Sequence, residues 1–234
     1  MGGLPKKVLA VIPARGGSKG IPKKNLIKIG DSTLVQRAVS ACVSAKRVTQ
    51  TYVSSDNYDI LDHAEQYGAD ILLRPQFLAS DTASSESVLF HTLDYAEQKN
   101  GYEFDIILLI QATSPFAVAE DIDYVVDLLE TYDSVFTGYR THEFVWELGE
   151  FGAVGINHDP RRRLRRQEIQ AHYFIENGAA YGMRCKGFKL TKQRFFGSVG
   201  IVEMPKLRSI EIDDHDDVDL AELINCHPSI QKPK

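Results

Sequence analysis

The sequence predicts an α/β fold of three layers, in which a mixed but mainly parallel sheet is covered by helices on both faces. Short runs of aliphatic and β-branched residues alternate along the chain with longer segments whose apolar residues recur every three or four positions. These are the patterns of buried strands and of amphipathic helices. Their regular alternation favours parallel strands joined by helical crossovers.

The first strand is expected at Val8 to Ile12, a continuous apolar run that leads into a glycine-rich turn. From Thr33 onward, Leu34, Ala38 and Cys42 recur every four positions and form one helical stripe. Strands and helices then alternate. In order, we expect a strand at 51–54, a helix at 57–67, an extended segment at 70–73, a helix at 84–98, a strand at 105–111, a helix at 120–131 and a strand at 134–138.

The pattern changes after residue 138. Trp146, a glycine-punctuated stretch and the basic run Arg161 to Arg166 interrupt the alternation, which resumes with strands at 179–183 and 200–204 and a closing helix at 216–225. We interpret residues 139–178 as an excursion used for dimerisation, within a single domain that spans residues 1–234. The predicted assembly is a homodimer with shared active sites.

Composition limits the classes of function. The net charge of −5 offers no broad positive field, so we expect neither nucleic acid nor a membrane as partner, although the basic run at 161–166 could suggest a nuclear signal. The three cysteines, Cys42, Cys185 and Cys226, show no zinc spacing, which favours a reducing compartment. The apolar run at 8–12 is too short for a signal peptide. We therefore expect a cytoplasmic protein.

The glycine-rich segment after the first strand is the first candidate site. Its glycines let backbone N–H groups surround an anion, and Arg15, Lys19 and Lys24 add positive charge. The spacing fits neither GxxxxGK[ST] nor GxGxxG, so we interpret it as a different triphosphate cradle and weigh a plain surface turn as the alternative. The nucleotide contacts expected here are Ala14, Arg15, Gly16, Gly17, Ser18, Lys24 and Asn25, with Arg15 and Lys19 also catalytic.

An acidic cluster near the end of the chain is the candidate metal site. Glu211 and Asp213 alternate along an extended segment and therefore share one face. Two carboxylates on one side suit Mg²⁺ (or Mn²⁺) that also binds substrate phosphates. The next acidic residues, Asp216, Asp217 and Asp219, are interpreted as the solvated start of a helix.

These motifs resemble those of the acylneuraminate cytidylyltransferases, the CMP-sialic acid synthetases, whose signature is a PARxGSKGxxxKN loop. Residues 13–25 match that loop nearly throughout. The resemblance covers roughly Val8 to Leu220 and implies a nucleotide-diphospho-sugar transferase-like fold. Its further motifs are Arg74-Pro75 with Leu78-Ala79-Ser80-Asp81-Thr82, Leu109-Ile110-Gln111-Ala112-Thr113-Ser114-Pro115, Arg165-Arg166-Gln167 and Glu176-Asn177-Gly178-Ala179.

The resemblance assigns roles to several residues. It implies that Asn25, Arg74 and Ser80 contact the cytosine and ribose, and that Gln111 contacts the sugar acid. A surface salt bridge for Arg74 and a loop cap for Gln111 are the alternatives. An arginine of the basic run reaches the sugar acid across the dimer interface in the family, and Arg166 is our choice.

The remaining roles concern the sugar pocket and the metal. The resemblance places an aromatic sugar contact at Tyr181, and Phe195 and Phe196 would line the pocket for the N-acyl group, with ordinary core packing as their alternative. The family carries an Asp-x-Asp pair where this chain has Glu211 and Asp213. We therefore take Asp213 as the catalytic metal ligand and Glu211 as the second ligand.

The resemblance implies transfer of CMP from CTP to the anomeric hydroxyl of an N-acylneuraminic acid, a nine-carbon sugar acid, with release of pyrophosphate. Legionaminic, pseudaminic or 3-deoxy-manno-octulosonic acid are alternative acceptors. A nucleotide-binding protein without catalysis is the alternative from another class. The general base is left open between a carboxylate such as Asp213 and a hydroxide supplied by the metal.

Overall fold

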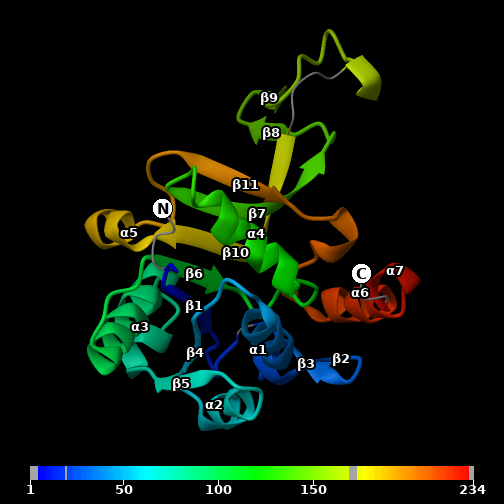
Figure 1. Ribbon diagram of the computed structural model, residues 1–234. Helices are drawn as coiled ribbons and strands as arrows, with labels where there is room; N and C mark the ends of the chain where they lie inside the picture. The colour runs from blue at the N-terminus through cyan, green and yellow to red at the C-terminus, as the bar shows by residue number, and fades with distance from the viewer. Residues whose placement is uncertain (1–4, 19, 169–172, 232–234) are drawn as a thin grey trace.

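Figure 1 shows the computed structural model of the chain, which describes residues 5–18, 20–168 and 173–231. Its centre is one seven-stranded sheet. From one edge to the other the strands are β11 (Val199–Glu203), β7 (Ser134–Thr141), β10 (Tyr173–Arg184), β6 (Ile106–Ile110), β1 (Val8–Pro13), β4 (Gln50–Ser55) and β5 (Asp70–Leu73).

Within this sheet only β10 runs against its neighbours. Strands β5, β4, β1 and β6 pair in parallel, as do β7 and β11, whereas β10 is antiparallel to both β6 and β7. The prediction of a mixed, mainly parallel sheet is confirmed. The carboxyl ends of β1, β4 and β6 therefore meet at one edge, where ligands bind in open α/β sheets.

Helices cover both faces of the sheet (Figure 1). Ala10 and Ile12 of β1 belong to the core under α1 (Leu34–Ser44), α2 (Tyr58–Glu65), α4 (Ala119–Leu128) and α6 (His215–Asn225). Leu9 and Val11 belong to the core under α3 (Ser85–Asn100) and α5 (Cys185–Thr191). Because successive side chains of a strand point to opposite faces, the continuous apolar run of β1 serves both cores.

Local sequence sets the ends of these helices. The Thr33 side chain accepts a hydrogen bond from the Gln36 N–H, and the Gln36 side-chain oxygen accepts one from the Thr33 N–H. Together these bonds form a capping box at the start of α1. Ser84 caps α3, and Gly101 ends it with φ of 71°. Asp214 caps α6, so part of the acidic cluster stabilises a helix start, as expected for that stretch.

Several parts of the fold differ from the sequence-based expectation. The helix expected at 120–131 ends at Leu128, and β7 and β10 extend further than predicted. The short helix α5 was not predicted, because Gly187 and Thr191 are weak helix formers. The small antiparallel pairs β2 (Lys28–Ile29) with β3 (Ser32–Thr33) and β8 (Trp146–Gly149) with β9 (Gly152–Gly155) were not predicted either.

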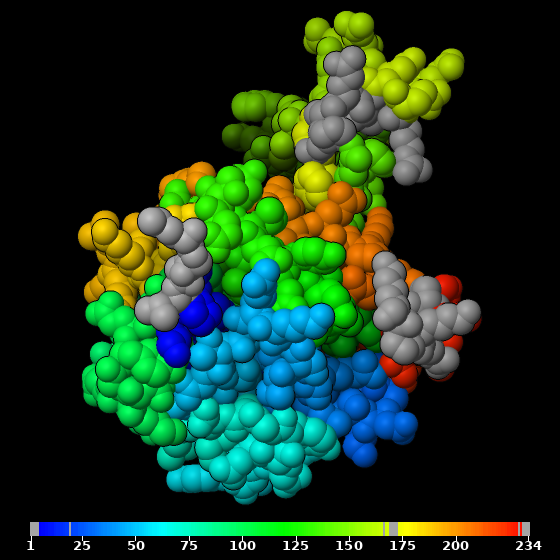
Figure 2. All heavy atoms as spheres, viewed as in Figure 1, coloured from blue at the N-terminus to red at the C-terminus, as the bar shows by residue number. Residues whose placement is uncertain are grey.

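The excursion forms an arm beyond the ends of β7 and β10. In Figures 1 and 2 the β8–β9 hairpin and the chain that follows it stand away from the main body. The hairpin is exposed on all sides, and Phe151 at its tip is 98% exposed. The last short helix, α7 (Pro228–Gln231), follows α6 near the C-terminus. No helix within the described residues is both long and apolar enough to span a membrane.

Gly182 is a point where α4 lies directly on the sheet. A Cβ atom at this position would lie 2.5 Å from Cγ1 of Val125 and 2.9 Å from Cδ1 of Leu129. We expect Gly182→Ala to lower the free energy of unfolding by about 1–3 kcal/mol through overpacking. Thermal melting measures this, at roughly 2–4 °C per kcal/mol. Gly149→Ala is the control, because its Cβ would have only an ordinary contact at 3.7 Å. Equal melting temperatures for the two variants would contradict this packing.

Candidate active site

The loop after β1 is fastened to its neighbours at three points. The Ala14 N–H donates to the Ser54 carbonyl at 3.0 Å, and the Gly16 N–H donates to the Asp56 carboxylate at 2.9 Å. The buried Asn25 side chain donates from Nδ2 to the Arg15 carbonyl at 2.9 Å. The loop is therefore held in shape by the carboxyl end of β4 and by its own last residue. A preformed anion site needs a backbone that is fixed in this way.

Two loop glycines are required by close approaches. A Cβ atom at Gly20 would lie 2.4 Å from the Asp213 carbonyl oxygen, and one at Gly16 would lie 2.8 Å from Cβ of Asn57. Around Gly17 there is open space within 4 Å. The loop thus passes between the start of α2 and the acidic segment.

The loop cations are held by carboxylates from across the site. Arg15 bonds through Nη1 to Oδ1 of Asp81 at 2.8 Å. Lys24 donates from Nζ to Oδ1 of Asp213 at 3.0 Å and to the Ile212 carbonyl at 2.9 Å. Lys19, the third predicted cation, lies outside the described residues. A bound triphosphate would compete with Asp81 and Asp213 for these cations.

Arg74 and Ser80 lie on the β5 side of the same site. Arg74 follows β5 and is 6% exposed, so the alternative of a surface salt bridge does not describe it. Burial lowers the pKa of its guanidinium, Asp56 raises it and Arg15 lowers it. Its buried Nε has no hydrogen-bond partner within the described part of the chain. Ser80 directly precedes Asp81, and its hydroxyl donates to the Phe77 carbonyl at 2.9 Å.

The acidic pair meets the β6 loop on the other side. The Ile212 N–H donates to the Thr113 carbonyl at 2.8 Å, and Thr113 Oγ1 donates to Oε1 of Glu211 at 3.1 Å. A Cβ atom at Gly178 would lie 3.0 Å from Oε2 of Glu211 and 3.2 Å from Oε1 of Gln111. The predicted sugar contact and the second predicted metal ligand therefore flank the same glycine.

The two carboxylates of the acidic pair, Glu211 and Asp213, influence one another. Burial raises the pKa of Glu211, and the charge of Asp213 raises it further. Ile212 between them is fully buried, so the predicted alternation is confirmed. The described part of the chain contains no group of three or more His, Cys, Asp or Glu side chains placed to hold a metal. A cation here would rely on two carboxylates, water and substrate phosphates, which suits Mg²⁺.

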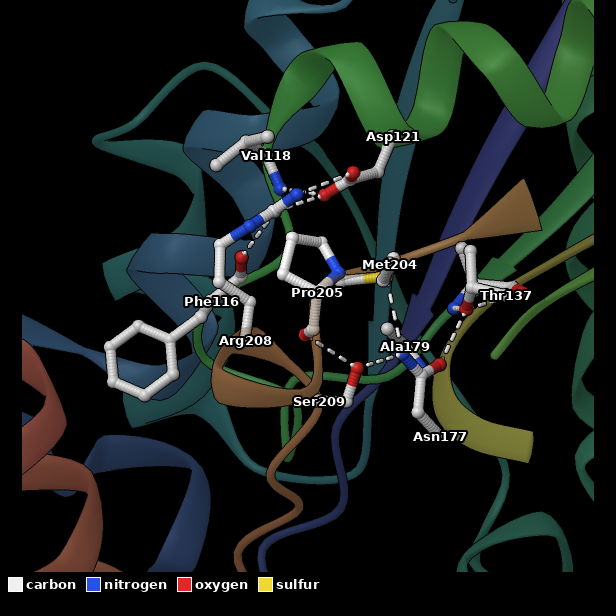
Figure 3. Close-up of polar contacts among 11 residues, drawn as sticks. Phe116, Val118, Asp121, Thr137, Asn177, Ala179, Met204, Pro205, Arg208 and Ser209 are labelled. Carbon is white, nitrogen blue, oxygen red and sulfur yellow. Dashed lines mark hydrogen bonds and ion pairs between the residues drawn. The ribbon is translucent and has the colours of Figure 1, made fainter. Parts of the chain in front are cut away.

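A clamp of buried polar groups holds the segment before Glu211 (Figure 3). Arg208 donates to both carboxylate oxygens of Asp121, from Nη1 at 2.5 Å and from Nη2 at 2.9 Å, and to the Phe116 carbonyl at 3.0 Å. Asn177 donates to Ser209 Oγ at 3.0 Å and accepts from Thr137 Oγ1 at 2.7 Å. We call Arg208, Asp121, Asn177 and their partners the clamp. It fixes the acidic pair relative to β6 and β10.

The aromatic residues predicted for the sugar pocket separate into two groups. Tyr181 is buried, and its hydroxyl donates to Glu176. Burial raises the pKa of that hydroxyl, and the bond to Glu176 raises it further. Phe195 meets the Tyr181 ring edge-on at 6.0 Å. Phe196 instead lies against α5, where its ring would be 2.1 Å from a Cβ atom at Gly187, so core packing describes it.

Arg166 lies far along the arm. It begins the short 3-10 helix η3 (Arg166–Glu168), which comes after the β8–β9 hairpin. In Figure 1 residues 156–168, which follow β9, lie at the end of the arm away from the sheet. The structure therefore does not bring the backbone of Arg166 to the loop after β1 of the same chain.

Sequence reasoning missed the carboxylates that organise this site. Asp56 directly follows β4, and its place at the carboxyl end of a parallel strand is a signal that could have identified it. Asp81 belongs to the motif at residues 78–82, but its contact with Arg15 could not be read from spacing, because the two residues are 66 positions apart.

Comparison with solved structures identifies the class of fold. CMP:2-keto-3-deoxy-manno-octonic acid synthetase complexed with CTP superposes with a TM-score of 0.67 at 15% identity, over 93% of this chain and 98% of that chain. At this identity the likeness concerns the fold. It confirms the nucleotidyltransferase-like α/β architecture.

A family model described as cytidylyltransferase matches residues 9–194, and the chain belongs to this family. N-acylneuraminate cytidylyltransferase of Escherichia coli O18:K1:H7 is 30% identical over 97% of this chain and 54% of its own length. CMP-N,N'-diacetyllegionaminic acid synthase of Legionella pneumophila is 37% identical over 52% of this chain and 53% of its own. The chain spans about half the length of these curated relatives.

The clamp generates a stability prediction. Arg208→Ala leaves the buried Asp121 carboxylate without its partner, so we expect a loss of about 3–5 kcal/mol in the free energy of unfolding. Lys206→Ala is the control two residues away, because its ion pair with Glu143 is exposed and contributes at most about 1 kcal/mol. Denaturant unfolding of both variants measures the difference. Similar midpoints would show that the clamp does not stabilise the fold.

Proposed function

We propose that this chain transfers CMP from CTP to the anomeric hydroxyl of an N-acylneuraminic acid and releases pyrophosphate. One observation carries the proposal: the glycine loop after β1 lies against the acidic segment, with Gly20 touching the backbone of Asp213 and Lys24 bonded to its carboxylate. A triphosphate held by that loop would have the acidic pair beside it. The relatives named above perform reactions of this type according to their names.

The chemistry assigned to these residues is mainly positioning and charge stabilisation. Arg15 and Lys19 would neutralise the phosphates and the leaving pyrophosphate, and Gln111 would orient the sugar acid for in-line attack on the α-phosphorus. Asp213 and Glu211 would hold Mg²⁺ (or Mn²⁺), which supplies further charge neutralisation on the phosphates when bound. Arg74 and Ser80 would border the cytidine, since both lie beside the Arg15 and Asp81 pair.

The first alternative is the same reaction with a different sugar acid as the acceptor. The Legionella relative acts on a legionaminic acid by its name, so the same reaction on legionaminic acid is the second candidate. Pseudaminic and 3-deoxy-manno-octulosonic acids are further acceptors of the same chemical class. A nucleotide-binding protein without catalysis is the alternative from another class, and the presence of Lys19, Gln111 and Asp213 in the sequence argues against it.

Pyrophosphate release tests the proposed reaction. With CTP and Mg²⁺, we expect release that depends on the sugar acid and is greatest with N-acetylneuraminic acid in a panel of nine-carbon and eight-carbon acids. Faster release with a legionaminic acid would assign the acceptor to the second candidate. Binding of CTP without release for any member of the panel would favour the non-catalytic alternative.

Asp213→Asn separates catalysis from nucleotide binding. A ligand whose charge acts mainly at the transition state affects turnover more than affinity, so kcat should fall about 10²- to 10³-fold. The KM for CTP should change far less. Steady-state kinetics measure both constants, and Asp219→Asn in the exposed acidic stretch is the control. A pure affinity defect would place Asp213 outside the catalytic metal site.

The assembly we propose is a homodimer whose active sites are shared through the arm, in the cytoplasm. Large apolar side chains of the arm are exposed in the single chain, among them Leu148 and Phe151 at 85% and 98%. Such apolar patches mark protein interaction sites. Because η3 lies away from the chain's own loop after β1, Arg166 would serve the neighbouring subunit. Free thiols at Cys42, Cys185 and Cys226 suit a reducing compartment.

Mixed dimers test the shared site. Arg166→Ala and Asp213→Asn homodimers should each have little activity, because each lacks one half of every site. If subunits exchange at random, half of the dimers are mixed and one of their two sites is intact, which restores about a quarter of wild-type activity. Pyrophosphate release after subunit exchange measures the recovery. Exchange without recovery would show that Arg166 acts within its own chain.

A further inference from the structure

Lys24 is the most enclosed cation in the described part of the loop after β1. Its side chain is 14% exposed, compared with 35% for Arg15 and 67% for Lys23. The ammonium group donates to the Ile212 carbonyl at 2.9 Å and to Oδ1 of Asp213 at 3.0 Å. The side chain of Lys24 therefore ends inside the acidic segment.

This one ammonium group compensates charge on both carboxylates of the acidic pair. It bonds to Asp213 directly and to the carbonyl of Ile212, the residue between Asp213 and Glu211. Burial and the charge of Asp213 raise the pKa of Glu211, whereas the charge of Lys24 lowers it. A divalent cation at the acidic pair would need the same Asp213 carboxylate, and two neighbouring positive charges repel each other. Lys24 and the metal would therefore compete for Asp213.

The ion pair between Lys24 and Asp213 can be exchanged for other partners. The side chain of Asp213 is 71% exposed, and an ion pair with an exposed partner costs little free energy to break. Lysine carries its charge on a flexible aliphatic stem, so the ammonium group can turn to another anion without movement of the backbone. A triphosphate in the glycine loop would be close by, because a Cβ atom at Gly20 would lie 2.4 Å from the Asp213 carbonyl oxygen.

We propose that Lys24 is an internal counterion that occupies Asp213 in the absence of nucleotide and releases it to the metal when a triphosphate binds. The proposal rests on the proposed function, which supplies the nucleotide and the metal, and adds how the binding of one depends on the other. Phosphate oxygens become the acceptors for the Lys24 ammonium group, which frees Asp213 for the divalent cation. Because nucleotide and metal both favour the state in which the ion pair is broken, each raises the affinity for the other.

Binding of Mn²⁺ in the absence of nucleotide tests the proposal without any turnover. Lys24→Met keeps an unbranched side chain of similar length and removes its charge, so Asp213 loses the partner that competes with the metal. We expect the Kd for Mn²⁺ to fall about 5- to 150-fold, the usual range of coupling between two sites. Electron paramagnetic resonance measures the free Mn²⁺ during a titration. Lys23→Met is the matched control, because it removes the same charge from an exposed pair with Asp59 and should change the Kd less than about 3-fold.

Binding of CTP in excess EDTA tests the same ion pair from the nucleotide side. Asp213→Asn removes the carboxylate that Lys24 has to leave, so calorimetry should show the Kd for CTP falling about 5-fold or more. Asp219→Asn is the control for a general loss of negative charge and should change the Kd less than about 2-fold. In a double-mutant cycle, the gain from Asp213→Asn should be far smaller when Lys24 is already methionine.

Circular dichroism checks that every variant is folded. Because Asp213 is exposed, Asp213→Asn and its control provide the test even if Lys24→Met does not fold.

The outcomes distinguish this inference from the proposed function. Wild-type protein that does not bind CTP overturns both. Protein that binds CTP, but whose Kd for Mn²⁺ is unchanged or raised by Lys24→Met, overturns the inference alone. An equal gain in CTP affinity from Asp213→Asn with and without Lys24 has the same consequence, because the carboxylate then acts on the triphosphate by repulsion only. The predicted binding changes without pyrophosphate release for any acid would support the inference and overturn the proposed reaction.

Discussion

The register of the antiparallel strand β10 is the constraint on which the site depends. Ala180 pairs with Ile110 at the carboxyl end of β6, which sets Asn177 and Gly178 just beyond that edge. The register on β7 shifts between Glu176 and Tyr181, and Gly178 adopts a φ of +70° that favours glycine. At this irregularity Gly178 lies between Gln111 and Glu211.

Electrostatic balance explains how an acidic chain would hold the proposed triphosphate. Each described loop cation lies beside a carboxylate, since Arg15 pairs with Asp81 and Lys24 with Asp213. These ion pairs hold the cations in place and cost little free energy to break, because the carboxylates of Asp81 and Asp213 remain exposed to solvent. A triphosphate carries more negative charge than either carboxylate and would take over these cations. Burial and the charge of Asp213 raise the pKa of Glu211. A nearby cation would stabilise the charged form of this carboxylate.

Much of the fold could be predicted from local patterns, whereas much of the site could not. The strands β1 and β6 are continuous apolar runs, and α1 begins with a capping box that Thr33 and Gln36 encode within four residues. The glycine loop and the alternation of Glu211 and Asp213 were also visible in the sequence. The pairing of Arg15 with Asp81 and of Arg194 with Glu86 depends on tertiary packing, which no local spacing records. The hairpin β8–β9 was not predicted, because exposed strands lack the burial pattern.

The central claim is that the loop after β1 and the acidic segment form one site around the triphosphate. A crystal structure with CTP and Mn²⁺ tests this most directly, because the anomalous scattering of manganese locates the metal directly. The account predicts a single triphosphate cradled by residues 14–25, with manganese bonded to Asp213. A triphosphate bound elsewhere, or manganese held without Asp213, would contradict it.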